Sequence, residues 1–303
     1  MGETPRWVDL LDPDRVQLEE ALSRKLDDRD TERILDPHDR DSGPRPTLES
    51  HDDYVFGIFM VAVDHPHADR IYYQEVDLVV SPDTVLTVRK TPPDGEPFDP
   101  EELREACAKP IPAGMIAYHL VNAIAERYLD LIDNLNDDID GLEERVDELP
   151  PAKVRERLSH LRHDMLRIRR TLAPTRDAVR RVIDDRIELE SYELFPPEID
   201  RRFSDAYDKL LRAAEGLDLS RDLLAGVRDY SQSKISIDQN ERVKQLSAIA
   251  SMVLIPTFIV GVYGQNFDHM PELHWRLGYL FSWTVIVVST LAQFVYFRRK
   301  RWI

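Results

Sequence analysis

Two uninterrupted apolar runs near the C-terminal end dominate the hydrophobic pattern. Residues 246–263 read "LSAIASMVLIPTFIVGVY" and residues 277–297 read "LGYLFSWTVIVVSTLAQFVYF", and neither run contains a charged side chain. A helix needs about 20 apolar residues to cross about 30 Å of hydrocarbon. Soluble core helices of this length without a charge are uncommon, so the runs predict two transmembrane helices in contact with membrane lipid.

A basic cluster fixes the expected orientation of these helices. "RRKRWI", residues 298–303, follows the second run directly, and clusters of Lys and Arg stay on the cytoplasmic side. Two spans return the chain to the side where it started. We therefore expect an inner or plasma membrane protein with both termini in the cytoplasm and a short external loop over residues 265–276.

Residues 1–110 show strand patterns and predict a cytoplasmic domain of the α/β or α+β class. Residues 54–63, "YVFGIFMVAV", form a β-rich apolar run. Residues 76–80 and 85–89 flank "SPDT", a turn-type sequence, and predict a β-hairpin. Residues 91–102, rich in proline and acidic side chains, predict a loop.

Residues 111–196 have a helical pattern throughout and predict a helical hairpin. Apolar residues recur every three or four positions in two stretches, separated by "PP" at 150–151. The first stretch contains Ile124, Tyr128, Leu131, Leu135, Ile139, Leu142, Val146 and Leu149, and the second Val154, Leu158, Leu161, Met165, Ile168 and Leu172. We expect the two prolines to end the first helix.

Residues 197–264 predict one long stalk helix that continues into the membrane. Pro197 and the acidic residues Glu198 and Asp200 suit a first helical turn. No further proline appears until Pro256. A helix of this length would extend roughly 95 Å at 1.5 Å per residue, with the first transmembrane span over about residues 245–264.

The charge of the chain is strongly divided between body and tail. Residues 246–303 contain five Lys and Arg and two Asp and Glu, a net of +3, so the total of −17 leaves −20 on residues 1–245. Such an acidic body argues against nucleic-acid binding, which needs basic surface. It fits either a surface that concentrates cations or a salt-adapted one. Cys107 is the only cysteine, which suits a reducing compartment.

Small and polar residues mark one approximate stripe along the long helix and into the first span. The stripe is polar at first, then small and apolar, and ends in "GQN": Asp229, Ser233, Ser236, Asn240, Val243, Ala250, Leu254, Thr257, Gly261 and Gly264. Such a stripe indicates either close helix–helix packing or the lining of a pore. The pattern alone leaves both interpretations open.

The C-terminal region resembles the CorA-type magnesium and cobalt transport family. The resemblance is carried by "IPTFIVGVYGQNF" (255–267), "MPELHWRLGY" (270–279) and "YFRRKRW" (296–302), and extends more loosely to "SDAYDKL" (204–210) and to "RP" and "DDYVF" within 45–56. The family pattern has a proline-containing first span that ends in Tyr-Gly-Met-Asn-Phe. In this sequence the middle position is Gln265.

The resemblance implies a fold, an assembly and a set of pore residues. It implies an α/β/α sandwich with a helical hairpin and stalk helix, two transmembrane helices, and a homopentameric funnel around a central pore. Gly264, Gln265 and Asn266 would form the selectivity filter, and Glu272 would lie in the external loop. The pore lining would be Thr257, Leu254, Leu246, Val243, Asn240 and Asp229.

The resemblance also implies regulation by intracellular Mg²⁺ bound between cytoplasmic domains. Asp205 matches the family's sensing carboxylate at the subunit interface, and Asp36 and Asp39 in "ILDPHDRD" are candidates for its partner. Mg²⁺ would thus be both transported and regulatory, and Co²⁺ and Ni²⁺ are further candidate ions. No organic cofactor is expected.

Two other functions remain open at this stage. A zinc-transporting branch of the same superfamily replaces the middle residue of the filter motif, as Gln265 does here. A membrane-anchored coiled-coil scaffold would explain the stalk but not "YGQNF" followed by "MPEL". An enzyme is not expected, because the sequence has no P-loop, nucleophile motif or HExxH site.

Overall fold

The computed structural model of the chain describes residues 5–22, 24–36, 45–63, 72–91, 97–190, 192–265, 270 and 275–303. The chain divides into two compact units, residues 1–228 and residues 229–303. Each unit is described by itself.

The first unit is built on a five-stranded sheet in the order β1-β5-β4-β3-β2. The strands are β1 (Arg6–Leu11), β2 (Thr47–Ser50), β3 (Val55–Val63), β4 (Tyr72–Val80) and β5 (Thr84–Arg89). β1 runs parallel to β5 and the other neighbours are antiparallel. The predicted hairpin around "SPDT" is confirmed as β4–β5, whereas β1 and β2 were not predicted.

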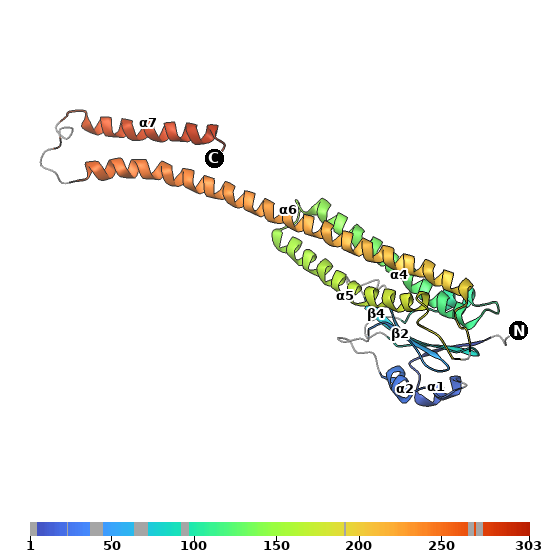
Figure 1. The fold of residues 1–303 in the computed structure, drawn as a ribbon. Coiled ribbons are helices and arrows are strands. Elements are labelled where there is room, and N and C mark those ends of the chain that lie inside the picture. Colours follow the sequence, from blue (N-terminus) through green and yellow to red (C-terminus); the bar gives the residue numbers. More distant parts are fainter. Residues whose placement is uncertain are drawn as a thin grey trace. The chain divides into compact units, whose positions relative to one another are not determined.

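Helices cover both faces of the sheet, so the unit is the α/β/α sandwich that was expected (Figure 1). One face carries α1 (Arg15–Ala21) and α2 (Asp28–Leu35). The other carries α3 (Glu101–Ala106), α4 (Ala113–Arg145) and α5 (Pro151–Ile183).

Side chains along each strand point alternately to the two faces of the sheet, and each face therefore has its own hydrophobic core. Val76, Leu78 and Val80 of β4 belong to the core shared with α4 and α5. Val79 of the same strand and Leu86 of β5 belong to the core shared with α1 and α2. Successive side chains of a strand point to opposite faces, and a strand buried on both faces reads as a continuous apolar run.

The first helix of the hairpin ends earlier than the sequence predicted. α4 stops at Arg145, and the amides of Glu148 and Leu149 bond to the Arg145 carbonyl in a turn. Proline disfavours helical geometry in the residue before it, so Leu149 cannot continue a helix into Pro150. Pro151 instead lies in the first turn of α5, where its missing N–H costs nothing.

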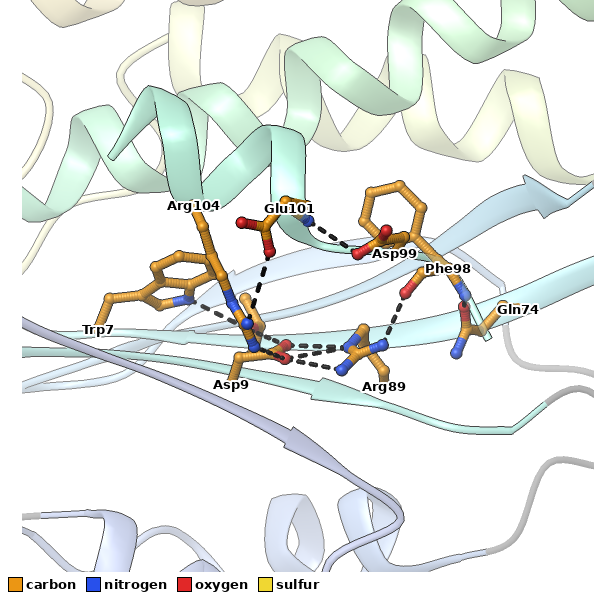
Figure 2. Close-up of polar contacts among 9 residues, drawn as sticks. Trp7, Asp9, Gln74, Arg89, Phe98, Asp99, Glu101 and Arg104 are labelled. Atoms are coloured by element: carbon orange, nitrogen blue, oxygen red, sulfur yellow. Dashed lines mark hydrogen bonds and ion pairs between the residues drawn. The ribbon is translucent and has the colours of Figure 1, made fainter. Parts of the chain in front are cut away.

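A polar network joins the sheet edge to α3 (Figure 2). The Arg89 guanidinium lies 2.8 Å from the Asp9 carboxylate, and a second Arg89 nitrogen donates to the Phe98 carbonyl at 2.6 Å. Arg104 of α3 lies 3.7 Å from the same Asp9 carboxylate. Because the side chain of Asp9 is only 7 % exposed, these contacts supply the partners that its charge requires.

A second buried ionic cluster lies on the opposite face of the sheet. The Lys90 ammonium is 2.6 Å from the Glu75 carboxylate and 3.5 Å from the Asp77 carboxylate, and it donates to the Arg33 carbonyl at 2.8 Å. All three charged side chains are buried. This cluster ties the end of α2 to the centre of the sheet.

Residues Pro197–Tyr263 form a single helix, α6, which belongs to both units. In the first unit α6 runs parallel to α4: Lys209 bonds to Glu126 at 2.6 Å, and Ser220 bonds to Asn136 further along. Gly216 allows this close approach, because a Cβ there would lie 2.8 Å from Ile132.

The second unit consists of the end of α6 and α7 (Gly278–Arg299). Both helices contain windows long and apolar enough to cross a membrane by length and composition, and only 6 % of each window is buried. A core helix of a soluble protein would be mostly buried, so the low buried share favours the transmembrane interpretation.

Candidate functional site

The predicted pore residues that the structure describes lie on one side of α6. At 100° per residue they fall within about 120° of one another around the helix axis. They are all exposed in the single chain: Asp229, Asn240, Val243, Leu246, Leu254, Thr257 and Gly264. The stripe therefore exists as a continuous open face, with leucines between polar positions.

α7 packs against a different side of α6. Gln293 of α7 donates its side-chain amide to the Ser251 carbonyl at 3.3 Å. Ala248, one turn before Ser251, is fully buried. On the helical wheel Ala248 lies roughly 140° and Ser251 roughly 80° from the centre of the stripe. Packing of α7 therefore leaves the stripe open.

The sequence analysis did not identify the Gln293 contact. The sequence feature that could have predicted this contact is Gln293 itself, a single amide inside an apolar span. Amide side chains in transmembrane helices often form hydrogen bonds to a neighbouring helix. Among the described residues, the Gln293 carbonyl oxygen has no hydrogen-bond partner.

The hydroxyl of Thr257 presents an oxygen rather than a proton to its surroundings. Its Oγ1 donates to the Val253 carbonyl at 2.7 Å, one turn earlier in the helix. Since the single hydroxyl proton is used within the helix, the remaining lone pairs are available as acceptors. An acceptor on the open face suits a cation or the hydrogens of a water molecule bound to one.

Pro256 removes one backbone hydrogen bond from this helix. Proline has no N–H, so the carbonyl of Met252 loses the bond it would accept in a regular helix. Within a membrane such a carbonyl needs water, a side chain or an ion as its partner.

The predicted filter motif begins where α6 ends. Gly264 follows the last helical residue, and its amide bonds to the Val260 carbonyl at 2.9 Å. A Cβ at Gly264 would lie 3.1 Å from that carbonyl oxygen, a tight contact, so glycine allows the close turn. Gln265 is exposed just beyond it, whereas Asn266 and Glu272 lie outside the described residues.

The predicted regulatory carboxylates lie in the first unit. Asp205 is exposed near the start of α6, and Asp36 is exposed at the C-terminal end of α2. Among the described residues no hydrogen bond or ion pair joins them, and no group of three or more His, Cys, Asp or Glu side chains could hold a metal ion. Asp39 lies outside the described residues.

Comparison with known proteins shows similarity over the whole chain. The model of the family described as "CorA-like Mg2+ transporter protein" matches residues 2–299. The chain is 29 % identical to the cobalt/magnesium transport protein CorA of Thermotoga maritima, over 100 % of this chain and 84 % of that protein.

Solved structures show the same fold. The complete CorA magnesium transporter of Methanocaldococcus jannaschii matches with a TM-score of 0.80 at 20 % identity, covering 98 % of this chain and 91 % of that one. The cytoplasmic domain of ZntB from Vibrio parahaemolyticus matches with a TM-score of 0.56 at 15 % identity, covering 78 % and 90 %. Neither likeness in fold distinguishes between ions.

The family match confirms the resemblance noted in the sequence and decides against the scaffold interpretation. It also confirms that the chain is a transporter rather than an enzyme. The chain belongs to the family of CorA-like Mg²⁺ transporter proteins.

Proposed function

We propose that this protein is a divalent-cation channel, chiefly for Mg²⁺, that conducts ions along the open face of α6 in a homopentamer. The observation that carries the proposal is the open stripe itself. It lies away from α7 and combines a hydroxyl acceptor at Thr257 with apolar levels at Leu254 and Leu246. If this face were turned toward lipid, the Thr257 oxygen would have no hydrogen-bond donor or cation to interact with.

Several copies are needed to complete such a pore. One chain supplies a single side chain at each level of the stripe, whereas an ion with its water shell must be surrounded. A closed ring places the same residue around the axis at every level. The family resemblance supports five copies, and the exposed apolar side chains of the second unit support burial against lipid and neighbouring copies.

The chemistry of the stripe favours recognition of a hydrated ion. Mg²⁺ dehydrates reluctantly and prefers octahedral oxygen geometry. Residues 246–263 contain no carboxylate that would replace its waters. A ring of Asn266 oxygens, next to Gly264 at the outer end, would accept hydrogen bonds from the water shell. Rings of Leu254 and Leu246 would close the pore by excluding water.

The driving force would be the membrane potential. An inside-negative potential contributes about 2.3 kcal/mol per charge per 100 mV, so a divalent cation enters downhill. This mechanism needs no organic cofactor.

Regulation would act through Asp205. Metal bound between Asp205 and a carboxylate of a neighbouring copy, Asp36 or Asp39, would hold the ring closed. Loss of internal Mg²⁺ would leave the carboxylates in mutual repulsion, and the unbroken α6 would carry the change to the leucines. With Asp205→Ala we expect Mg²⁺ uptake to become less sensitive to internal Mg²⁺. Unchanged inhibition would contradict this part of the proposal.

Ion flux into proteoliposomes tests the main proposal. We expect Mg²⁺ uptake by the full-length protein and a loss of at least about tenfold with Asn266→Ala, since polar filter contacts are worth about 1.4 kcal/mol or more. Thr290→Ala is the matched control, because the Thr290 hydroxyl bonds to the Ile286 carbonyl within α7 and away from the stripe. No divalent flux through correctly inserted protein would overturn the proposal.

The same assay decides between Mg²⁺ and the zinc alternative. Gln265 stands where the family pattern has methionine, so Zn²⁺, Co²⁺ and Ni²⁺ should be measured beside Mg²⁺. We expect Mg²⁺ flux to exceed Zn²⁺ flux. A preference for Zn²⁺ that persists in Gln265→Met would assign the chain to zinc transport.

A further inference from the structure

α4 carries an acidic stripe on its outer side. α4 contains eight Asp and Glu and two Arg, a net of −6. Five of the acidic residues recur every three or four positions and are all exposed: Asp130, Asp133, Asp137, Asp140 and Glu144. On the helical wheel this acidic stripe lies opposite the buried positions Leu131, Leu135 and Leu142.

α5 carries an arginine stripe with the same period. In a chain of net charge −17, α5 contains ten Lys and Arg and three Asp and Glu, a net of +7. Arg155, Arg162 and Arg169 follow one another at intervals of seven residues and are exposed. This arginine stripe spans about 21 Å at 1.5 Å per residue, the same length as the acidic stripe from Asp130 to Glu144.

The two stripes do not neutralise each other within one chain. The ion pair that joins α4 to α5 among the described residues is Arg157 with Asp138, at 2.8 Å, and neither residue belongs to a stripe. Among the described residues, no member of the acidic stripe of α4 or the arginine stripe of α5 has an ion pair. Both stripes therefore present unneutralised charge on the exposed surface of the hairpin.

We propose that the arginine stripe of one copy docks on the acidic stripe of a second copy. Asp130, Asp137 and Glu144 repeat every seven residues, as do the three arginines, so three levels about 10.5 Å apart can pair at once. The contact joins two different surfaces, and such contacts close into rings when the rotation allows it. The inference rests on the assembly of several copies proposed above, but not on which ion is carried.

The charge pattern favours a second copy over an anionic membrane or a nucleic acid. Either of those would meet the arginine stripe but would be repelled by the acidic stripe on the same hairpin and by a body of net charge −20. A second copy satisfies both stripes with one contact. Paired charges also fix the register of two helices better than apolar contact alone.

Disulfide cross-linking between two differently tagged full-length chains tests the contact. One chain carries Asp137→Cys in the acidic stripe. The other carries Ser159→Cys, at an exposed position between Arg155 and Arg162. The matched control replaces Ser159→Cys by Glu156→Cys, which is exposed on another side of α5. Burial raises the pKa of the native Cys107 thiol to about 11, so Cys107 stays protonated and reacts slowly.

We expect a cross-link between the two tags with Ser159→Cys and at least about threefold less with Glu156→Cys. Adding Arg155→Glu and Arg162→Glu to the Ser159→Cys chain should lower the yield at least about threefold, because attraction becomes repulsion. Adding Asp130→Arg and Glu144→Arg, at the two remaining paired levels of the acidic stripe, to the other chain should restore it. Restoration would separate a docking contact from damage to the fold.

Other outcomes would overturn the inference in distinguishable ways. If the two tagged chains co-purify but do not cross-link, the proposed contact between the stripes is wrong, whereas the proposed channel is unaffected. Tags that do not co-purify would remove the assembly itself. Arginine-dependent binding to anionic vesicles without a cross-link would assign the arginine stripe to lipid headgroups instead.

Discussion

The two units bury their apolar side chains in very different ways. The first unit encloses two cores, one on each face of its sheet. The second unit is the more apolar of the two in sequence, yet its buried apolar side chains among the described residues are Ala248 and Phe297. Leu254 and Tyr279, for example, are 68 % and 80 % exposed.

This difference shows that the first unit is suited to water and the second unit to lipid. In water, apolar side chains must be enclosed by the chain itself. In lipid, apolar side chains need no enclosure, and the backbone is satisfied within each helix. Charges follow the same division: the first unit buries ion pairs, whereas residues 246–263 and 277–297 contain no charged side chain.

The largest expected effect comes from breaking the buried ionic cluster of the first unit. Lys90→Met removes the cation that lies between the buried side chains of Glu75 and Asp77 and should lower the free energy of unfolding by about 3–5 kcal/mol. Hydrogen-exchange mass spectrometry of the full-length protein measures this as lost protection in β4 and β5. Lys153→Met, at an exposed position in α5, is the control and should have little effect.

A matched pair of truncations compares the two units directly. Leu120 is 1 % exposed in the first unit and Leu291 is 57 % exposed in the second. Leu120→Ala should cost about 2–5 kcal/mol through lost burial and a cavity, and Leu291→Ala less than about 1 kcal/mol. The same hydrogen-exchange experiment measures the loss of stability in both variants. Equal costs would mean that Leu291 is enclosed in the assembled protein.

The pH dependence of stability should belong to the first unit. Burial raises the pKa of the Asp77 carboxyl well above its usual range, with Lys90 opposing and Glu75 adding to the shift. The folded state then keeps a proton that the unfolded chain has lost. This contribution is complete below the ordinary aspartate pKa and is lost as pH rises toward the raised value.

Asp77→Asn should remove this part of the pH dependence. In the wild type, stability should fall by up to about 1.4 kcal/mol per pH unit across that window. The asparagine variant should show a flatter profile in unfolding experiments over the same pH range. A profile with the same slope as the wild type would show that Asp77 is ionised in the folded protein.

The smallest expected effect lies between the two helices of the second unit. Gln293→Leu removes the bond to the Ser251 carbonyl and should cost about 0.6 kcal/mol, the average for such bonds in lipid. Hydrogen exchange in α7 measures it, and Gln293→Glu provides the comparison of an added charge. A loss above about 2 kcal/mol would indicate that Gln293 has a further partner in the assembly.

Local sequence patterns predicted the elements that carry long, regular signals. The β4–β5 hairpin and the two successive helices α4 and α5 follow from apolar periods and turn residues. β1 and β2 were not predicted, because short strands leave little pattern in the local sequence and depend on partners elsewhere in the chain. β1 is a six-residue edge strand whose partner, β5, lies more than seventy residues away in the chain, and β2 has four residues.

For the candidate site, the sequence by itself determined the stripe and its chemistry. A continuous helix places residues at fixed angles, so spacing alone puts Thr257, Leu254 and Leu246 on one side of α6. Only the tertiary structure decided that this side is the open one. That choice depends on where α7 packs, at Ala248 and Ser251, and packing between distant segments is not encoded in the period of either helix.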